Sequence, residues 1–237
     1  MPTSSNPIFP ETARPQSPLH GRRKGKKLRS HQAGLMEDLL PQLALKIDRP
    51  IADPVGLFVK APTRIWVEIG FGGGEHLAGQ ALSNPDTGFL GCEPFENGAA
   101  KLLAIIAKAQ LNNIRLHVGD AGELIDRLPS ASVDRVYLLY PDPWPKRRQR
   151  KRRFISDGIL KRLARVLIPG GELRFATDID DYAGWALARV MRSAELSWHP
   201  ASSADWRVPW AGWTGTRYEA KAVAAGRPSS YFTFVRK

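Results

Sequence analysis

The sequence contains a single cysteine, Cys92, among its 237 residues. One cysteine cannot build a disulfide framework within the chain, and sparing use of cysteine is typical of proteins in a reducing compartment. No apolar run approaches the roughly 20 residues that span a bilayer. The basic and polar N-terminus is not followed by the apolar segment of a secretory signal. We therefore expect a soluble, cytoplasmic protein that does not enter a membrane.

Several catalytic signatures are absent as well. The sequence contains neither the G-x-S-x-G turn of many hydrolases nor a phosphate-binding P-loop. Its histidines are scattered without the spacing of metal ligands, so no metal site is predicted. These histidines are His20, His31, His76, His117 and His199. His76, which follows a glycine-rich turn, is expected to pack or to cap a helix.

Positive charge is abundant but confined to two short segments. The formal net charge is +12 and the pI is near 10.1. Residues 1–31 carry a net +6 and residues 146–153 a net +7, which leaves the rest of the chain at −1. Such blocks attract polyanions through Coulomb forces and counterion release. For the N-terminal segment, a solvated charge run or an anionic membrane surface is an equal alternative, whereas the setting of the internal tract favours nucleic acid.

After a proline-rich section that ends near Pro62, short apolar runs alternate with helical stretches. This alternation is typical of an α/β protein with a doubly wound, mostly parallel sheet covered by helices. The predicted strands are Ile65–Ile69, Gly88–Cys92, Ile114–Val118, Val133–Tyr140 and Glu172–Ala176. The predicted helices are Glu75–Ser83, Gly98–Gln110, Gly122–Leu128, Phe154–Leu167 and Asp181–Ala194.

The ends of the domain are predicted from weaker signals. Residues 1–33 show no apolar period and are predicted to be a disordered basic arm, so residues 34–237 form one domain. A short amphipathic helix is expected from Gly34 to about Leu45, despite Pro41. The Pro-Gly-Gly at 169–171 is expected to end a helix. Leu196–His199 and Tyr231–Val235 are expected to close the sheet as an antiparallel edge hairpin with a long insertion between them.

A glycine-rich turn connects the first predicted strand to a helix in the segment Trp66 to Glu75, WVEIGFGGGE. Glycines there allow positive φ and a close approach of the backbone to a ligand. A dinucleotide fingerprint requires a third glycine where this chain has Glu75, and an acid there disfavours a pyrophosphate. A cofactor without phosphates fits better, and Glu68 would attract the cationic sulfonium of S-adenosylmethionine. A purely structural turn is the alternative.

Further acids follow the next two predicted strands. Glu93 lies roughly 20 residues beyond the glycines, where a carboxylate accepts ribose hydroxyls. Asp120 follows the third strand and is placed to meet an adenine. Each acid is also a candidate helix N-cap. Their occurrence at successive strand ends nevertheless favours a ligand site at the carboxyl edge of the sheet.

The fourth predicted strand leads into the segment Tyr140 to Lys146, YPDPWPK, and directly into the basic tract. Three prolines stiffen this loop, so Asp142 is expected to be held in place. Trp144 offers a flat face on which a base can stack. A rigid acid, an aromatic plate and seven cations in eight residues predict a site that modifies a base and binds the phosphates around it.

These motifs together resemble the bacterial tRNA (guanine-N7)-methyltransferase family over roughly residues 60–237. The PDPWPK loop followed by basic residues is the most specific part of the resemblance, whereas the glycine motif occurs in many methyltransferases. The matching segments are Glu68-x-Gly70-x-Gly72-Gly73-Gly74, Gly91-Cys92-Glu93-Pro94, Gly119-Asp120-Ala121, Pro141 to Lys146, Thr177-Asp178 and Thr216-Arg217-Tyr218-Glu219.

The resemblance implies a Rossmann-like class I methyltransferase fold, S-adenosylmethionine as cofactor, and methylation of guanine 46 in the variable loop of tRNA to 7-methylguanosine. It implies that Asp142 is catalytic and also binds the cofactor. The other implied cofactor contacts are Glu68, Gly70, Gly72, Glu93 and Asp120. The implied substrate contacts are Lys146, Asp178, Thr216, Arg217, Tyr218 and Glu219. The implied RNA contacts are Arg148, Arg150, Lys151, Arg152 and Arg153.

The chemistry of these residues supports the same assignment. Guanine N7 carries a lone pair and no proton, so catalysis is mostly positioning, and an anionic Asp142 would stabilise the transferred positive charge. Asp178 and Glu219 are suited to accept hydrogen bonds from the N1–H and amine of guanine.

Other functions are disfavoured. Methylation of an exocyclic amine commonly uses two prolines after the acid, and Asp142-Pro143-Trp144 lacks the second. Pyrimidine C5 methylation needs a cysteine nucleophile, but Cys92 is expected to be buried. A catalytically silent RNA-binding protein would not need complete acidic and glycine motifs. Glu75 disfavours a nicotinamide oxidoreductase, and the sequence leaves monomer and homodimer open.

Overall fold

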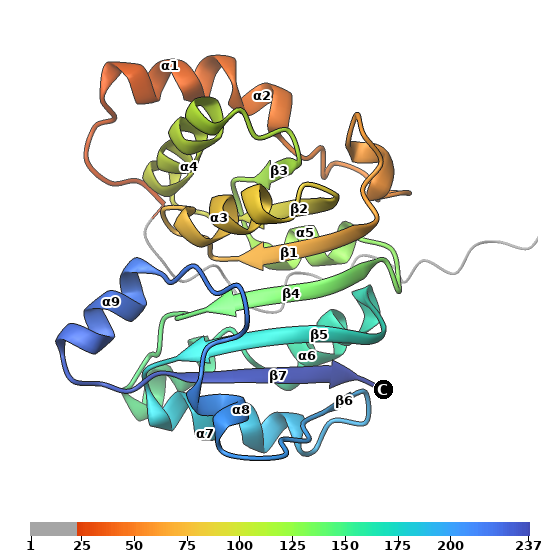
Figure 1. Cartoon of the computed structure of the whole chain (residues 1–237), viewed down its shortest axis with the longest axis vertical. Helices are drawn as coiled ribbons and strands as arrows, with labels where there is room; N and C mark the ends of the chain where they lie inside the picture. The colour runs from red at the N-terminus through yellow and green to blue at the C-terminus, as the bar shows by residue number, and fades with distance from the viewer. Residues whose placement is uncertain (1–22) are drawn as a thin grey trace, which may run out of the picture.

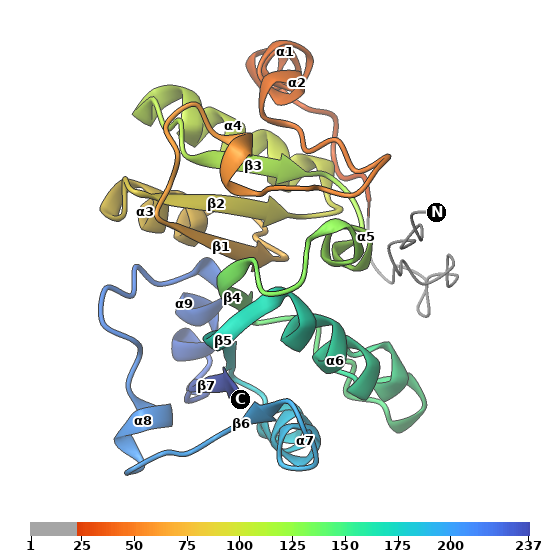
Figure 2. The same ribbon diagram turned by 90° about the vertical axis from the view of Figure 1, so that its right-hand side faces the viewer.

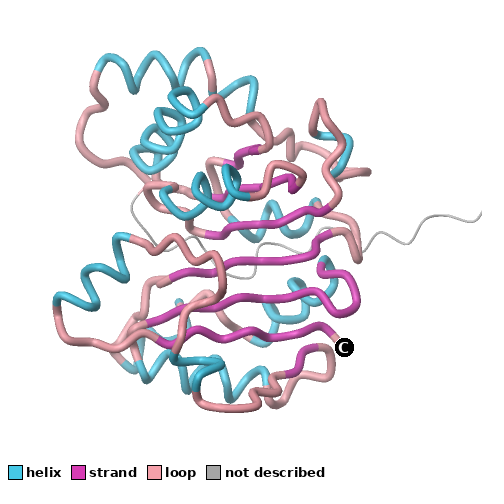
Figure 3. Tube along the Cα trace, in the orientation of Figure 1, coloured by secondary structure: helices cyan, strands magenta, loops and turns pink. Residues whose placement is uncertain are grey.

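The computed structural model describes residues 23–237, which form an α/β domain with helices on both faces of one central sheet (Figure 1). Residues 1–22, which belong to the predicted arm, lie outside the described residues. Figure 3 shows the strands as a single layer flanked by helices. The predicted α/β class is therefore confirmed.

The sheet has seven strands in the order β3-β2-β1-β4-β5-β7-β6. The first five pair in parallel, β7 is antiparallel to both β5 and β6, and the order reverses beside β1, where β4 pairs on its other side. The strands are β1 Arg64–Ile69, β2 Thr87–Cys92, β3 Ile114–His117, β4 Val133–Leu139, β5 Leu167–Thr177, β6 Leu196–Ser197 and β7 Ser230–Arg236. Ligands bind at such a switch point, outside the carboxyl ends of the strands.

Two hydrophobic clusters lie on the two faces of the sheet. One contains buried residues of α3 Glu75–Ser83 and α4 Glu96–Ala109. The other contains those of α5 Ala121–Arg127, α6 Asp157–Val166 and α7 Asp180–Val190. The edge-on view in Figure 2 separates these two sets of helices. Both faces of the strands are thus covered, which explains why β1 and β2 are apolar rather than alternating.

The N-terminal helix differs from its predicted boundaries. It begins at Ser30 rather than Gly34 and is divided into α1 Ser30–Asp38 and α2 Leu40–Leu43. The division occurs before Pro41, which occupies the first turn of α2, where proline is tolerated. The last four residues of the predicted disordered arm are therefore helical.

The Pro-Gly-Gly segment does not end a helix directly. Helix α6 already ends at Val166, and β5 begins at Leu167 and includes residues 169–171. The pairing register with β4 shifts near Val133, and Gly170 has φ of 76°. The glycines therefore shape an irregular start of the strand.

The predicted closing hairpin is confirmed, with one difference. The antiparallel strand is β7, but the outermost strand is β6, which pairs over only two residues. Between them the insertion contains α8 Ala204–Arg207 and α9 Arg217–Ala224. Trp210 and Trp213 pack against the hydrophobic cluster on the α3 and α4 face of the sheet, and Trp210 donates a hydrogen bond to Thr233 at 2.9 Å.

Two 3₁₀ helices, Val55–Leu57 and Arg147–Arg152, complete the described elements. Within residues 23–237, no helix has the length and apolar character needed to cross a membrane.

Candidate functional site

The glycine-rich turn adopts a backbone that other residues rarely reach. Gly70, Gly72 and Gly74 have φ of 71°, 57° and 79°, and Gly74 is the left-handed residue before α3. The N–H of Gly70 donates to the carbonyl of Cys92 at 2.7 Å, which ties the turn to the end of β2. The turn therefore lies at the carboxyl edge, between β1 and β2.

Glu93 connects the end of β2 to this turn. Its carboxylate accepts hydrogen bonds from the backbone N–H of Gly72 at 2.8 Å and of Phe95 at 2.9 Å. Burial raises the pKa of the Glu93 carboxyl, against the opposing effects of these two hydrogen bonds and of the nearby Arg217 guanidinium. A carboxylate has about four acceptor positions, so these bonds orient Glu93 and leave acceptor capacity for ribose hydroxyls.

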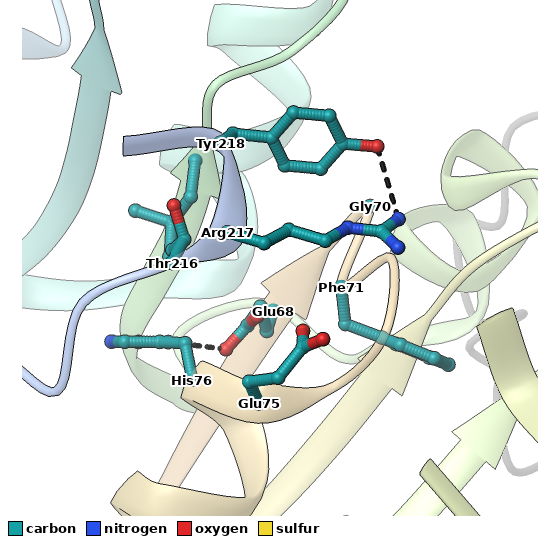
Figure 4. A pocket seen from close by; sticks show the side chains of 9 residues that line it. Glu68, Gly70, Phe71, Glu75, His76, Thr216, Arg217 and Tyr218 are labelled. Atoms are coloured by element: carbon teal, nitrogen blue, oxygen red, sulfur yellow. Dashed lines mark hydrogen bonds and ion pairs between the residues drawn. The ribbon is translucent and has the colours of Figure 1, made fainter. Parts of the chain in front are cut away.

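Glu68, at the end of β1, is buried and paired with His76. The Glu68 carboxylate lies 2.6 Å from His76 Nδ1, and Figure 4 shows this pair beneath the turn. The His76 ring contacts the rings of Tyr137 and Trp213. His76 therefore does more than pack, because it holds the carboxylate of a predicted cofactor residue.

Asp120 acts as a helix cap in this structure. It accepts a hydrogen bond from the N–H of Gly122 at 2.7 Å and is the N-cap of α5. Of the three acids predicted at strand ends, only Asp120 is the N-cap of a helix. Asp120, Glu93 and Glu68 nevertheless follow or end adjacent strands, as the sequence predicted.

Asp142 lies in a strained loop after β4. Tyr140 and Trp144 have φ of 48° and 41°, a region that non-glycine residues occupy at a cost of about 1–3 kcal/mol each. Loss of surrounding water raises the pKa of the Asp142 carboxyl, although the side chain still reaches solvent. The Asp142 charge also contributes to the raised pKa of Glu93. Strand β4 pairs in parallel with β1, so the loop that carries Asp142 leaves the sheet at the same edge as the glycine turn.

The start of α9 lies over the glycine turn. Thr216 caps α9 by accepting a hydrogen bond from Glu219 N–H at 3.0 Å. Arg217 donates to the Tyr218 hydroxyl at 3.1 Å, and Figure 4 shows both side chains above Gly70 and Phe71. A Cβ on Gly72 would lie 3.3 Å from Arg217 Nη2. Together with Glu68, Glu75 and His76, this segment lines the pocket at the carboxyl edge.

The two acids predicted to recognise a base have partners within the chain. Asp178 follows β5 and lies 2.7 Å from Arg227 Nε. Glu219 accepts hydrogen bonds from Trp213 Nε1 at 2.7 Å and from the Tyr231 hydroxyl. The chain thereby holds both carboxylates at this edge.

The basic tract forms the 3₁₀ helix Arg147–Arg152 on the α7 side of the site. Lys146 precedes the helix, and Lys146, Arg148 and Lys151 are exposed. Arg150 forms an ion pair with Asp181 at 2.8 Å, and Arg152 lies 5.0 Å from the centre of the Trp144 ring. Arg153 differs from these predicted RNA-binding residues, because it is only 3% exposed and its guanidinium contacts protein groups.

Three contributors to the site were not expected from the sequence. His76 is predicted only to pack or to cap a helix. Glu68 and His76 stand on either side of the glycine-rich turn, and this shared strand-to-helix connection is the one signal that could have paired them. Gly98 lies in a helix, as predicted, but its close approach to the turn was not expected: a Cβ on it would overlap the carbonyl oxygen of Gly72. Nothing in the sequence indicates that Asp181 pairs with the basic tract, apart from its acidic charge at the start of a predicted helix.

Burial is confirmed for Cys92, and it raises the pKa of the Cys92 thiol. Residues 23–237 contain no group of three or more His, Cys, Asp or Glu side chains arranged to hold a metal ion.

Comparison with known proteins agrees with this geometry. A family model described as "Putative methyltransferase" matches residues 62–231. The tRNA (guanine-N(7)-)-methyltransferase of Rhodopseudomonas palustris (strain BisB5) is 50% identical, over 95% of this chain and 89% of that protein. The corresponding protein of Agrobacterium fabrum (strain C58 / ATCC 33970) is 52% identical, over 92% and 94%.

Solved structures share the fold at low sequence identity. TrmN from Thermus thermophilus matches with a TM-score of 0.54 and 15% identity, over 74% of this chain and 45% of that chain. The 16S rRNA methyltransferase KamB matches with a TM-score of 0.51 and 16% identity, over 91% and 99%. These likenesses support the Rossmann-like class I methyltransferase fold. With the matched family model and relatives of about half identical sequence, they lead to one conclusion: the chain belongs to the tRNA (guanine-N(7)-)-methyltransferase family.

Proposed function

We propose that this protein transfers the methyl group of S-adenosylmethionine to N7 of a guanine in tRNA, namely guanine 46 of the variable loop, and forms 7-methylguanosine. The observation that carries the proposal is the placement of Asp142. Its loop follows β4, which pairs in parallel with β1, so it lies at the carboxyl edge beside the glycine turn and continues directly into the basic tract. Because tRNA is the substrate, we place the enzyme in the cytoplasm.

The residues at this edge fit S-adenosylmethionine better than a phosphate-bearing cofactor. Glu75, in the first turn of α3, lines the pocket and would repel a phosphate. Glu93 would bind the ribose hydroxyls, and the left-handed glycines would admit the methionine portion. Asp120 would face the adenine and Glu68 would supply negative charge beneath the turn. When bound, this cofactor supplies an electrophilic methyl group on a positively charged sulfur.

The catalytic contribution of the chain is electrostatic. The acceptor nitrogen carries a lone pair and no proton, so no residue has to act as a general base. Positive charge appears on the purine as the methyl group is transferred, and an ionised Asp142 stabilises it where water is partly excluded. The strained backbone on both sides of Asp142 fixes this charge before the reaction.

Recognition of guanine is assigned to the segment that covers the turn. Asp178 and Glu219 accept hydrogen bonds from the N1–H and amine, an edge that adenine does not present. To do so, Asp178 shares or exchanges its contact with Arg227, and Glu219 those with Trp213 and Tyr231. Thr216, Arg217, Tyr218 and Lys146 complete the contacts to the nucleotide.

The reaction is tested by incubating the purified protein with unmodified tRNA transcripts and S-adenosylmethionine. We expect 7-methylguanosine at a single variable-loop position, identified by mass spectrometry of mapped fragments. A different methylated nucleoside would overturn the target but keep the enzyme class. Absence of any product, with cofactor and tRNA still bound, would favour a silent RNA-binding protein.

The exposed cations of the tract are expected to contact phosphates. Exchange of Arg148 and Lys151 for glutamine should weaken tRNA binding and reduce the slope of log affinity against log salt by about 1.4 to 1.8, because each of the two phosphate contacts contributes about 0.7–0.9 to it. Exchange of Lys108 and Lys161, exposed lysines on α4 and α6, removes the same charge and is the control. If the two variants have equal slopes of log affinity against log salt, Arg148 and Lys151 do not contact phosphates.

A further inference from the structure

Arg153 is the one cation of the tract 146–153 whose side chain is removed from solvent. Its side chain has no exposed surface, whereas Asp181, its ion-pair partner, is 44% exposed. A buried guanidinium is stable only when its donors are satisfied and its charge is paired. The contacts of Arg153 therefore indicate what its charge does in the fold.

The guanidinium joins two separate segments. Its Nε donates to the carbonyl of Pro143 at 2.8 Å. Its other nitrogens donate to the Asp181 carbonyl at 3.2 Å and form the ion pair with the Asp181 carboxylate. The guanidinium also lies 4.9 Å and 5.1 Å from the ring centres of Tyr182 and Trp185. One planar fork thus connects the loop after β4 to the first turn of α7.

The bond to Pro143 acts at a strained point of the backbone. The Pro143 carbonyl belongs to the peptide bond that precedes Trp144, whose φ is 41°. Asp142 lies between this residue and Tyr140, whose φ is 48°. Strained residues persist only where surrounding contacts over-determine the backbone. Arg153 supplies such a contact one residue after Asp142.

The chain next to Arg153 is attached to α7 independently. The N–H of Ile155 donates to the Tyr182 hydroxyl at 3.2 Å, and Trp185 donates to the carbonyl of Ile155 at 2.8 Å. These bonds hold the end of the tract in place without the guanidinium. Loss of the Arg153 fork should therefore release the Asp142 loop more than it disturbs α7.

We propose that Arg153 is a positioning residue that fixes the backbone carrying Asp142, and not a residue that contacts RNA. This inference rests on the proposed function, because it assigns the fixed carboxylate to methyl transfer. Asp181 supports this arrangement, because it forms ion pairs with Arg153 and, at 2.8 Å, with Arg150. The same acid thereby connects the 3₁₀ helix of the basic tract to the buried Arg153.

The test compares Arg153→Lys with Arg165→Lys in the full chain. Arg165 lies on α6 and also donates to backbone carbonyls, those of Ile125 and Leu128 at the end of α5, outside the site. Lysine keeps the charge but lacks the fork that reaches Pro143 and Asp181 together. We expect Arg153→Lys to lower kcat by roughly 10- to 100-fold, the scale of a small misplacement of a catalytic group. The tRNA dissociation constant and its salt slope should stay unchanged. Arg165→Lys should retain kcat.

Several outcomes would overturn the inference. An unchanged kcat would do so, as would a reduced salt slope with kcat retained, which would make Arg153 an RNA contact. The folded fraction of Arg153→Lys is measured by circular dichroism at each assay temperature. If kcat is lowered only at temperatures where the variant is partly unfolded, Arg153 has a general structural role and the inference is wrong.

If Arg153→Lys does not fold, Asp181→Asn, which leaves the bond to Pro143 available, should lower kcat less and in the same direction. Full kcat in a folded Asp181→Asn would also overturn the inference. The wild-type protein is assayed for 7-methylguanosine in the same experiment. Its failure to form that product would refute the proposed function, whereas normal product with an active Arg153→Lys would refute only the positioning role.

Discussion

Exchange of Asp142 for asparagine is expected to lower kcat by about 10²- to 10³-fold, the effect of removing one preorganised electrostatic group from an active site. Asparagine keeps the size of the side chain but not its charge, so the affinity for tRNA should change little. Steady-state methyl transfer to a tRNA transcript measures the effect. Asp48→Asn, at an exposed aspartate away from the site, is the control for the loss of one negative charge.

The pH dependence gives a second measure of the same residue. The pKa of Asp142 is raised because the protein excludes part of its water. Activity should therefore fall, as the pH is lowered, above the usual range of an aspartate, near 3.9. A full rate in Asp142→Asn, or an acid limb of kcat unaltered in a weakly active variant, would contradict the catalytic role.

The stability of the folded protein should respond to pH in the opposite direction to the activity. A carboxyl whose pKa is raised by folding destabilises the folded protein when it is ionised, and this cost is relieved as the pH falls through the raised pKa. At neutral pH, Asp142→Asn should therefore unfold at a slightly higher temperature than the wild type. The difference should vanish at a pH below the ordinary aspartate pKa.

Exchange of Gly98 for alanine is expected to weaken the binding of S-adenosylmethionine strongly. A Cβ at this position in α4 would overlap the carbonyl oxygen of Gly72 and lie 3.3 Å from Glu93 Cγ. The glycine turn and the carboxylate that receives its N–H would have to separate. We expect at least a tenfold loss of affinity, equivalent to about 1.4 kcal/mol, measured by calorimetric titration with S-adenosylmethionine.

Gly184→Ala is the matched control for this experiment. Gly184 lies within α7, and a Cβ there would meet no atom within 4 Å. Because alanine favours the helix, this variant should bind the cofactor normally and gain up to about 1 kcal/mol of stability. Normal binding by Gly98→Ala would show that the turn does not need its close contact with α4.

Most of the central sheet is predictable from the sequence because its signals are local. Each of the first four parallel strands is an apolar run bounded by turn residues, and its observed ends lie within one residue of the expected ones. The start of β5 could not be predicted, because proline and glycine are typical of turns. The helix Arg217–Ala224 was missed because Ala222 is its one buried residue, which leaves no apolar period to detect.

The site is predictable at the level of positions but not of contacts. Parallel topology alone brings the residues that follow the strands to one edge, so Glu68, Glu93 and Asp142 were located correctly on it. The partners of these acids depend on long-range packing that spacing does not encode, as with Glu68 and His76. Arg153 looks like its basic neighbours, and only the apolar Phe154 and Ile155 that follow mark its approach to the core.

The position of β7 between β5 and β6 has a consequence for the nascent chain. Both neighbours precede β7 in the sequence, so they leave the ribosome before the strand that joins them exists. Until residues 230–236 emerge, β5 presents an open edge, and the stacking partner of Phe175, Phe232, is missing. Unpaired edges and exposed apolar rings favour aggregation and recruit chaperones. The Tyr231 bond to Glu219 also forms only then, so the sheet and the base-binding segment reach their final arrangement together, once β7 has been made.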